Sequence, residues 1–324
     1  MESSGKICRT VIYYKKVIVN ETNLPNRGGG GSIALLLLGE IGLRLYGFAE
    51  APLYKASDSY EYIAKPNQDI MRFGNHIHYN SYSQRSDEPD TTKVIILGLG
   101  DSVIFGGVQV DQDDIATSLF TKETGMQMLN ISAGSWGPDN CAAYLRENGL
   151  FGAKAMFLVV SSHDAHDNID HQPVVGVHPS YPDKQYPLAW AELLERYILP
   201  RVLPRKKTIE PDPDQKVIRA ISKDGTSIKK DGKVFNPGFD ELKIMADKAS
   251  IPLVVYLHAD REELELGRYN EQGGEIIKWS ERNKATLVRE LDYGFTSQDY
   301  RDGIHLSKSG QRKLADIMKE ILHL

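Results

Sequence analysis

Three residues of the types that together activate a serine occur in this sequence. Ser102 lies in the glycine-flanked stretch 98–106, and Asp302 and His305 lie close together near the C-terminus. A serine hydroxyl needs a base to take its proton, and an imidazole base needs an acceptor that fixes its tautomer and stabilises its positive charge. Side chains three residues apart on a turn can hydrogen-bond to each other, so the pair predicts a base and its partner. Each piece alone is also typical of an ordinary turn.

The segment before Ser102 is predicted to be a strand that carries the hydroxyl to a ligand-binding edge. Residues 93–99 are mainly apolar and β-branched, and Gly98 and Gly100 mark the end of the run. Such a continuous run is typical of a central strand buried on both faces of a parallel sheet. Ligands of open α/β sheets bind outside the carboxyl ends of the strands, so Asp101 and Ser102 are expected beside a substrate.

From residue 93 onward the chain alternates between strand-like and helix-like segments. The strands are expected at 93–99, 126–132, 154–161, 252–258 and 286–291. One helix is expected to begin near Asp113, and four more are expected at 138–148, 237–249, 262–282 and 307–322. This alternation implies a parallel five-stranded sheet with helices on both faces. Residues 172–235 interrupt it with a segment rich in Pro, Lys and Asp. That segment predicts an inserted cap with a helix at 188–198 and a hairpin near 230–233.

The first 92 residues lack this alternation and are predicted to form two segments. Residues 1–32 end in four glycines and a serine, a composition typical of an engineered flexible linker. This segment is therefore expected to be foreign to the domain, with a natural glycine-rich loop as the alternative. Residues 33–92 are expected to hold an apolar segment and a β extension with a hairpin around Gly74 and Asn75.

The apolar segment is too short and too interrupted to predict a membrane-spanning helix. It runs from Ile33 to Leu38, continues weakly to Tyr46, and is broken by Glu40 and Arg44. A membrane span needs about 20 apolar residues. The run also begins too late for a typical signal peptide. The run would fit a membrane anchor that has lost its first half. We therefore keep the hypothesis that the native parent protein associates with a membrane.

Composition and charge favour a globular protein without a nucleic-acid partner. The chain has 324 residues, of which 41% are hydrophobic, enough for a sizeable core. Its formal net charge is -5, whereas binding to nucleic-acid phosphates requires a basic face. The two cysteines, Cys8 and Cys141, lie in unrelated regions, so neither a disulfide framework nor a thiolate metal site is predicted.

Three blocks of the sequence, taken in order, resemble the SGNH or GDSL family of serine hydrolases and acyltransferases. The blocks are Gly100-Asp-Ser102, the stretch from Asn130 through Gly134 and Ser135 to Gly137, and Asp302-Gly-Ile-His305-Leu. The resemblance covers residues 93–324 and implies a three-layer α/β/α, flavodoxin-like domain. It also implies that Ser102 is the nucleophile, that His305 is the base, and that Asp302 orients the imidazole.

The resemblance further implies an oxyanion hole, and here one block departs from the family pattern. The backbone amides of Ser102 and Gly134 are expected to bind the developing oxyanion. The family usually supplies an asparagine after the third strand, but this chain has His163 within Ser161-Ser-His-Asp164. An imidazole N–H can also donate to an oxyanion. Loss of one such donor typically costs about 100- to 1000-fold in rate, so the substitution bears directly on turnover.

Several neighbouring residues are expected to support these groups. Asp101, Ser135, Trp136, Asn140 and Asp164 are assigned to substrate binding or to support of the loops, with Trp136 either packing or touching substrate. Asp164 and Asp167 are expected to hold the loop after the third strand through backbone hydrogen bonds.

The segment from His163 to His171 also raises an alternative based on a metal. It holds three histidines and three aspartates, and imidazole and carboxylate suit zinc or manganese. The spacing fits no recognised metal motif, so neither a metal nor an organic cofactor is expected. Metal-dependent hydrolysis through this segment stays as a third hypothesis.

The sequence as a whole predicts ester chemistry through an acyl-enzyme on Ser102. Water or a sugar hydroxyl would accept the acyl group, and the substrate would be a small-molecule or polysaccharide ester. The family resemblance adds acetylated carbohydrate as substrate and the cell envelope as location, with a cytoplasmic location as the alternative. The competing hypothesis is a binding protein that has kept the fold and lost turnover through the change at His163.

Overall fold

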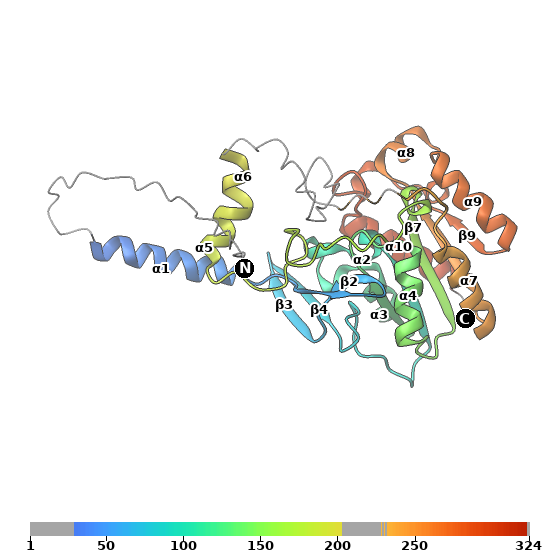
Figure 1. Ribbon diagram of the computed structural model, residues 1–324, viewed down its shortest axis with the longest axis horizontal. Coiled ribbons are helices and arrows are strands. Elements are labelled where there is room, and N and C mark those ends of the chain that lie inside the picture. The colour runs from blue at the N-terminus through green and yellow to red at the C-terminus, as the bar shows by residue number, and fades with distance from the viewer. Residues whose placement is uncertain (1–28, 203–227, 229, 231, 323–324) are drawn as a thin grey trace, which may run out of the picture. The chain divides into compact units, whose positions relative to one another are not determined.

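A five-stranded parallel sheet forms the centre of the domain (Figure 1). The computed structural model describes residues 29–202, 228, 230 and 232–322. The strands are β5 (Ile95–Gly100), β6 (Gln127–Ser132), β7 (Ala155–Ser161), β8 (Leu253–His258) and β9 (Thr286–Arg289). Their order across the sheet is β6-β5-β7-β8-β9. Counted along the chain, this is the 2-1-3-4-5 order of flavodoxin-like, doubly wound folds.

Helices cover both faces of this sheet. One layer comprises α4 (Pro138–Asn148), α7 (Gly238–Ala249) and α9 (Glu271–Asn283), and the other comprises α3 (Ala116–Thr124) and α10 (Lys308–Ile321). Successive residues of a strand point to opposite faces, so Leu97 of β5 packs into the first layer and Ile96 into the second. All residues of β5, β6, β7 and β8 are buried, which explains their nearly continuous apolar runs. The protein therefore has the predicted three-layer α/β/α architecture.

Three of the predicted helices agree closely with the structure, and one is divided. The helix predicted at 237–249 is α7. The helix predicted at 138–148 is α4, and the final helix begins after Ser307, whose hydroxyl accepts a hydrogen bond from the Gly310 amide. The single helix predicted at 262–282 is instead two helices, α8 (Arg261–Leu266) and α9. Gly267 ends α8 in the left-handed conformation with a φ of 63°, and Asn270 caps α9. A left-handed glycine and a new N-cap therefore break the periodic pattern.

Smaller differences occur where the chain forms tight 3-10 turns. The acidic residues near Asp113 form the turn η2 (Gln112–Asp114) before α3 begins, rather than the first turn of that helix. The last strand ends at Arg289, two residues earlier than predicted, and is followed by the turn η5 (Glu290–Tyr293). Both differences lie at element ends, where local sequence signals are weakest.

The β extension consists of two antiparallel hairpins. These are β1 (Tyr54–Ser57) with β2 (Glu61–Ala64), and β3 (Gln68–Arg72) with β4 (Asn75–Tyr79). The hairpin predicted around Gly74 and Asn75 is thus confirmed, and its turn places Phe73 and Gly74 at φ values of 54° and 80°. Two positive φ values suit the right-handed twist of a hairpin. Tyr62 and Ile77 join the same core cluster as Leu129 of β6, so the extension packs on the main domain.

The inserted segment contributes one irregular helix. Its parts are α5 (Ala189–Glu192), the π-helical η4 (Leu193–Ile198) and α6 (Leu199–Val202). The helix predicted at 188–198 is therefore present and continues to Val202. The hairpin predicted near 230–233 falls partly outside the described residues. The other short helical elements are α2 (Ser102–Phe105), η1 (Gly107–Gln109), η3 (Ser162–Ala165) and η6 (Ser297–Asp299).

The helix α1 (Gly29–Leu45) begins inside the glycine run that was predicted to be a flexible coil. Extending an existing helix costs less than starting one, so the leucine-rich turns that follow account for its helical conformation. Residues 1–28 lie outside the described residues. The chain divides into two compact units, Met1–Gly39 and Glu40–Leu324, and α1 crosses this boundary. Among the described helices, none has the length and apolar character that crossing a membrane requires.

Candidate active site

Ser102 lies at the carboxyl end of β5, on the tight turn into α2. The Asp101 side chain caps α2 by accepting a hydrogen bond from the Val103 amide at 2.8 Å. Gly100 has a φ of 150°, and a Cβ at this position would lie 2.5 Å from the carbonyl oxygen of Val159. A side chain at position 100 would therefore clash with neighbouring backbone, which explains why glycine precedes the Asp-Ser pair.

His305 and Asp302 meet Ser102 in a continuous chain of hydrogen bonds. The His305 Nε2 atom lies 3.0 Å from the Ser102 hydroxyl oxygen, although the two residues are 203 positions apart. The His305 Nδ1 atom lies 2.9 Å from one carboxylate oxygen of Asp302 and 3.0 Å from the other. The structure thus brings together the three side chains that the sequence singled out. The reason is topological, because the carboxyl ends of parallel strands meet at one edge of the sheet.

The Asp302 carboxylate is held by the loop that carries it. Its Oδ1 atom also accepts hydrogen bonds from the backbone amides of Ile304, at 3.0 Å, and His305, at 2.8 Å. Partial burial favours the neutral acid, but the hydrogen bonds from the His305 ring and from the two amides outweigh it and hold the pKa of Asp302 well below its usual range. Asp302 is therefore an ionised acceptor at neutral pH, as an imidazole partner requires.

Gly134 follows β6 and lines the same cavity as Ser102. A Cβ at Gly134 would lie 3.0 Å from the hydroxyl oxygen of Tyr181. The Gly134 carbonyl accepts hydrogen bonds from the hydroxyls of Tyr62 and Tyr181, both at 2.9 Å. The β extension and the insertion thus fix this turn through one tyrosine each. Sequence reasoning missed both tyrosines because no local spacing connects either of them with Gly134.

The other residues assigned to the turn after β6 divide between the cavity and the core. Ser135 lines the cavity with a φ of 59°, and its hydroxyl accepts a hydrogen bond from the Ile228 amide at 3.3 Å. Trp136 is 1% exposed and donates its indole N–H to the Tyr62 carbonyl, so its role is packing. Asn140 supports the turn as expected, because its side-chain oxygen accepts a hydrogen bond from the Gly137 amide.

His163 follows β7 in η3, and its side chain also lines the cavity. Its Nε2 atom lies 3.9 Å from a carboxylate oxygen of Asp101 and 3.8 Å from one of Asp167. Partial burial favours the neutral ring, but the charges of Asp164 and Asp167 outweigh it and raise the pKa of His163 to about 9. The ring is therefore an imidazolium at neutral pH, with both nitrogens as donors.

The aspartates around His163 behave differently from one another. The Asp164 side chain accepts a hydrogen bond from the Ser161 amide at 2.7 Å, as predicted, whereas the Asp167 side chain faces His163 instead of the backbone. Burial raises the pKa of Asp164 well above its usual value and that of Asp167 to about 6. The second oxygen of Asp164 has no hydrogen-bond partner among the described residues.

The histidines of the segment 163–171 do not gather around one point. His166 turns away and pairs with Glu275 of α9 at 3.1 Å. Within the described part of the chain, the group with metal-ligand spacing is Asp101, His163 and Asp164, whose ligand atoms all lie within 4.8 Å of one another. The capping bond that Asp101 makes to α2 and the raised pKa of His163, which keeps a proton on both ring nitrogens, leave this group poorly suited to a cation.

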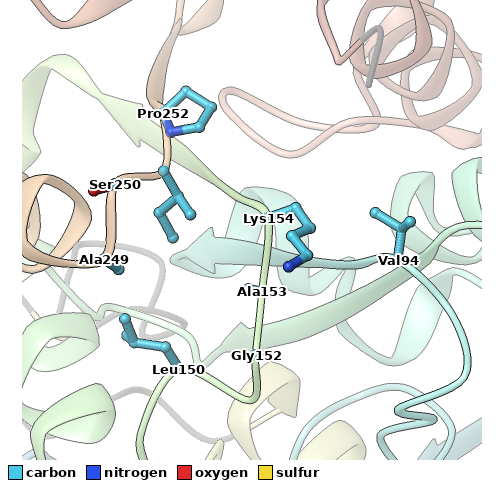
Figure 2. A pocket seen from close by; sticks show the side chains of 9 residues that line it. Val94, Leu150, Gly152, Ala153, Lys154, Ala249, Ser250 and Pro252 are labelled. Carbon is cyan, nitrogen blue, oxygen red and sulfur yellow. The ribbon is translucent and has the colours of Figure 1, made fainter.

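The cavity around Ser102 has a volume of about 1060 Å³ and is built from several parts of the chain. The β extension contributes Tyr54 and Phe73, the insertion contributes Tyr181 and Tyr197, and the loop after β9 contributes residues 301–305. The inserted segment therefore lies beside the active edge, where a cap was predicted. A second hollow of about 740 Å³ lies at the opposite edge, before β5, β7 and β8, and Figure 2 shows Lys154 and Pro252 in its wall. It holds none of the predicted site residues.

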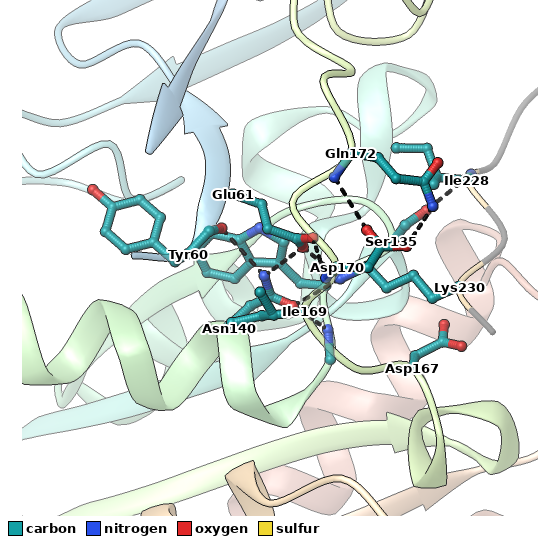
Figure 3. Close-up of polar contacts among 12 residues, drawn as sticks. Tyr60, Glu61, Ser135, Asn140, Asp167, Ile169, Asp170, Gln172, Ile228 and Lys230 are labelled. Carbon is teal, nitrogen blue, oxygen red and sulfur yellow. Dashed lines mark hydrogen bonds and ion pairs between the residues drawn. The ribbon is translucent and has the colours of Figure 1, made fainter. Parts of the chain in front are cut away.

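A buried ion pair connects the insertion to the β extension beside the Ser102 cavity (Figure 3). The Lys230 ammonium lies 2.5 Å from a carboxylate oxygen of Glu61 and 3.0 Å from the side-chain oxygen of Asn140. The other Glu61 oxygen accepts hydrogen bonds from the amides of Asp170 and His171. Burial alone would raise the pKa of Glu61, but the Lys230 charge and these hydrogen bonds hold it below its usual value. No sequence signal connects Lys230 with Glu61.

Comparisons with known proteins found similarity in structure alone. No protein-family model matches the chain, and no curated protein matches it. Similar solved structures include a member of the lipolytic protein G-D-S-L family from Veillonella parvula DSM 2008, at 12% identity and a TM-score of 0.39, covering 71% of this chain and 100% of that one. The structure of TesA has 15% identity and a TM-score of 0.39, and the match covers 71% of this chain and 98% of TesA. The structure of the psychrotrophic esterase EstA from Pseudoalteromonas sp. has 13% identity and a TM-score of 0.38, and the match covers 70% of this chain and 94% of EstA.

Proposed function

We propose that the protein is a serine-dependent ester hydrolase or acyltransferase that works through an acyl-enzyme. The observation that carries this proposal is the contact between the Ser102 hydroxyl and His305 Nε2 at 3.0 Å, with Asp302 on the other ring nitrogen. An imidazole between a hydroxyl and an ionised carboxylate can take the hydroxyl proton and remain stabilised as a cation. This arrangement makes Ser102 a nucleophile at neutral pH.

In the proposed reaction, His305 takes the Ser102 proton as the hydroxyl oxygen attacks the ester carbonyl. The tetrahedral intermediate carries a negative oxygen, and the amides of Ser102 and Gly134 are proposed to stabilise it. His305 then gives the proton to the leaving alcohol, and the acyl group remains on Ser102. A water molecule or an acceptor hydroxyl then loses its proton to His305 and attacks the acyl carbon. The bond between the acyl carbon and the Ser102 oxygen breaks, His305 returns the proton to that oxygen, and the acid or the new ester leaves.

His163 is proposed as the third donor of the oxyanion hole. The support is its place in the wall of the Ser102 cavity and its raised pKa, which keeps both ring nitrogens protonated at neutral pH. A charged donor attracts an oxyanion more strongly than a neutral amide does. The nearby carboxylate of Asp101 works in the opposite direction, so the charge state of the aspartates around His163 determines how much the ring contributes.

The substrate is proposed to be an acylated carbohydrate, and acetyl transfer or removal the reaction. The cavity is much larger than a small acyl group, and the β extension and the insertion supply aromatic side chains to its wall. Aromatic faces provide large apolar contact areas, and their hydroxyls provide polar ends, which suits a bulky ligand with both kinds of surface.

Membrane association is proposed for the region of α1. Residues 31–38 are exposed without interruption over more than two helical turns, and Leu35 and Leu38 are 71% and 65% exposed. An apolar helix exposed on every side fits a surrounding lipid phase. The full chain should float with phosphatidylcholine vesicles, and a variant carrying Leu35→Asp and Leu38→Asp should not. Equal flotation of the two proteins would contradict this proposal.

The hydrolase proposal is tested with p-nitrophenyl acetate and a fluorophosphonate probe. The parent protein should release nitrophenol and be labelled once, at Ser102, whereas Ser102→Ala should do neither. Ser118→Ala, which changes a serine of α3 outside the cavity, serves as the matched control and should behave like the parent. A parent protein that is neither labelled nor more active than Ser102→Ala would favour the binding-protein alternative.

A further inference from the structure

A fully buried histidine and glutamate lie behind the loop that carries Asp302 and His305. His258 is the last residue of β8, and Glu290 follows β9. Neither residue is exposed to solvent. The His258 Nδ1 atom lies 2.6 Å from a Glu290 carboxylate oxygen, and its Nε2 atom lies 2.7 Å from the carbonyl oxygen of Ile304. Ile304 is the residue directly before His305.

The partners of this pair determine where its protons are. The Ile304 carbonyl can only accept, so His258 Nε2 must carry a proton. The Glu290 carboxylate also contacts the hydroxyls of Tyr256, at 2.8 Å, and Tyr300. The 2.6 Å contact between His258 Nδ1 and Glu290 requires a second proton, which lies between the ring and the carboxylate. Burial alone would favour the neutral ring, but Glu290 and the Ile304 carbonyl outweigh it and raise the pKa of His258.

The hydrogen bond from His258 to Ile304 is one of three hydrogen bonds, among the described residues, that join the loop 300–305 to residues 258–261. The contacts are the His258 Nε2 to the Ile304 carbonyl at 2.7 Å, the Arg261 amide to the Gly303 carbonyl at 2.9 Å, and the Tyr300 hydroxyl to the Ala259 carbonyl at 2.8 Å. The His258 contact is the one adjacent to the base, and Glu290 holds the other nitrogen of the same ring. The opposite side of the loop faces Ser102.

We propose that His258 and Glu290 are a positioning pair, which holds the loop so that His305 stays within hydrogen-bond distance of Ser102. The proposal rests on the proposed serine chemistry and names the device that aligns its base. Neither residue touches the reacting atoms, so both act through the Ile304 carbonyl. Because a misplacement of about 1 Å can cost about 100-fold in rate, loosening this contact should lower kcat by about 10- to 100-fold. The KM for a small ester should change less than kcat, since the cavity walls that the β extension and the insertion supply are unaltered.

The test must separate loss of position from loss of stability. His258→Leu alone leaves the Glu290 charge buried without its partner, so both the melting temperature and kcat should fall. A triple variant with His258→Leu, Glu290→Leu and Tyr256→Phe removes the charge pair together with the hydroxyl that depends on it. An apolar replacement of a whole buried pair is often neutral in stability, so the melting temperature should recover while kcat stays low.

The matched control is Leu242→Ala in α7, a fully buried core residue far from the loop in sequence. It should lower the melting temperature and leave kcat with p-nitrophenyl acetate at 25 °C unchanged. A triple variant that regains both melting temperature and kcat would show that the pair is only structural, and would overturn the proposal.

Hydrogen exchange gives a second readout that does not depend on turnover. The amides of residues 300–306 should exchange faster in the triple variant than in the parent, and those of β5 should not. If the parent has no esterase activity, the proposed function fails, and exchange still decides the positioning role. Unchanged exchange in this loop would overturn the role of the pair even in an active enzyme.

Discussion

Replacement of Asp302 by asparagine tests the proposed mechanism at its most local point. In the structure, the Oδ1 atom of Asp302 accepts from the amides of Ile304 and His305, so the oxygen of an asparagine would be held there. Its NH₂ group would then face His305 Nδ1, which lies 2.9 Å from the present Oδ2. The ring would have to accept at Nδ1 and carry its proton on Nε2, toward Ser102. In that tautomer it cannot take the serine proton.

The expected loss in Asp302→Asn is about 10⁴-fold in kcat, the loss typical of a wrong tautomer in a serine triad. That factor corresponds to about 5 kcal/mol in the activation free energy. Steady-state hydrolysis of p-nitrophenyl acetate measures it, and circular dichroism checks that the variant is folded. Asp302→Asn in a Ser102→Ala background should cause no further loss, because the residues act as a unit. A single variant within about tenfold of the parent would refute the reasoning.

Stability should also respond to this change in a pH-dependent way. The lowered pKa of Asp302 means that its carboxylate stabilises the fold above the ordinary aspartate pKa of about 3.9, and that this contribution is lost as the pH falls through the lower folded-state value. Asp302→Asn should therefore be less stable than the parent at pH 7, and the difference should shrink in acid. Denaturant unfolding at several pH values measures this, and a gap that widens in acid would contradict the assignment.

Three further changes have defined outcomes. His163→Ala should lower kcat by about 100- to 1000-fold at neutral pH. The rate advantage of the parent over this variant should shrink as the pH rises through the His163 pKa of about 9, and pH–rate profiles of both proteins measure it. Lys230→Met leaves Glu61 buried without its partner and should lower the free energy of unfolding by about 3–5 kcal/mol. Denaturant titration measures this loss, and a loss below about 1 kcal/mol would contradict the burial argument. Gly100→Ala should lower the melting temperature, because its Cβ would lie 2.5 Å from the Val159 carbonyl, and an unchanged melting temperature would contradict the clash.

Spacing along the chain was enough to predict the parts of the site that lie within one strand end or one loop. The apolar run before Ser102 indicated the end of a buried strand, and the alternation that follows indicated the doubly wound sheet. Asp302 and His305 are three residues apart, so their hydrogen bond follows from one short loop. Local signals failed where a single residue changes the backbone, as at Gly267, which ends α8 and divides the helix predicted at 262–282.

Which distant groups meet could be learned from the folded arrangement alone. His305 reaches Ser102 across 203 residues, Lys230 reaches Glu61 across 169, and His258 reaches Ile304 across 46. None of these distances is a period of a helix or a strand, so no pattern along the chain encodes them. They arise because parallel strands bring their carboxyl ends to one edge of the sheet, and because buried charges must find partners wherever packing places them. The types of the reacting residues are thus readable in the sequence, whereas their alignment is a property of the fold.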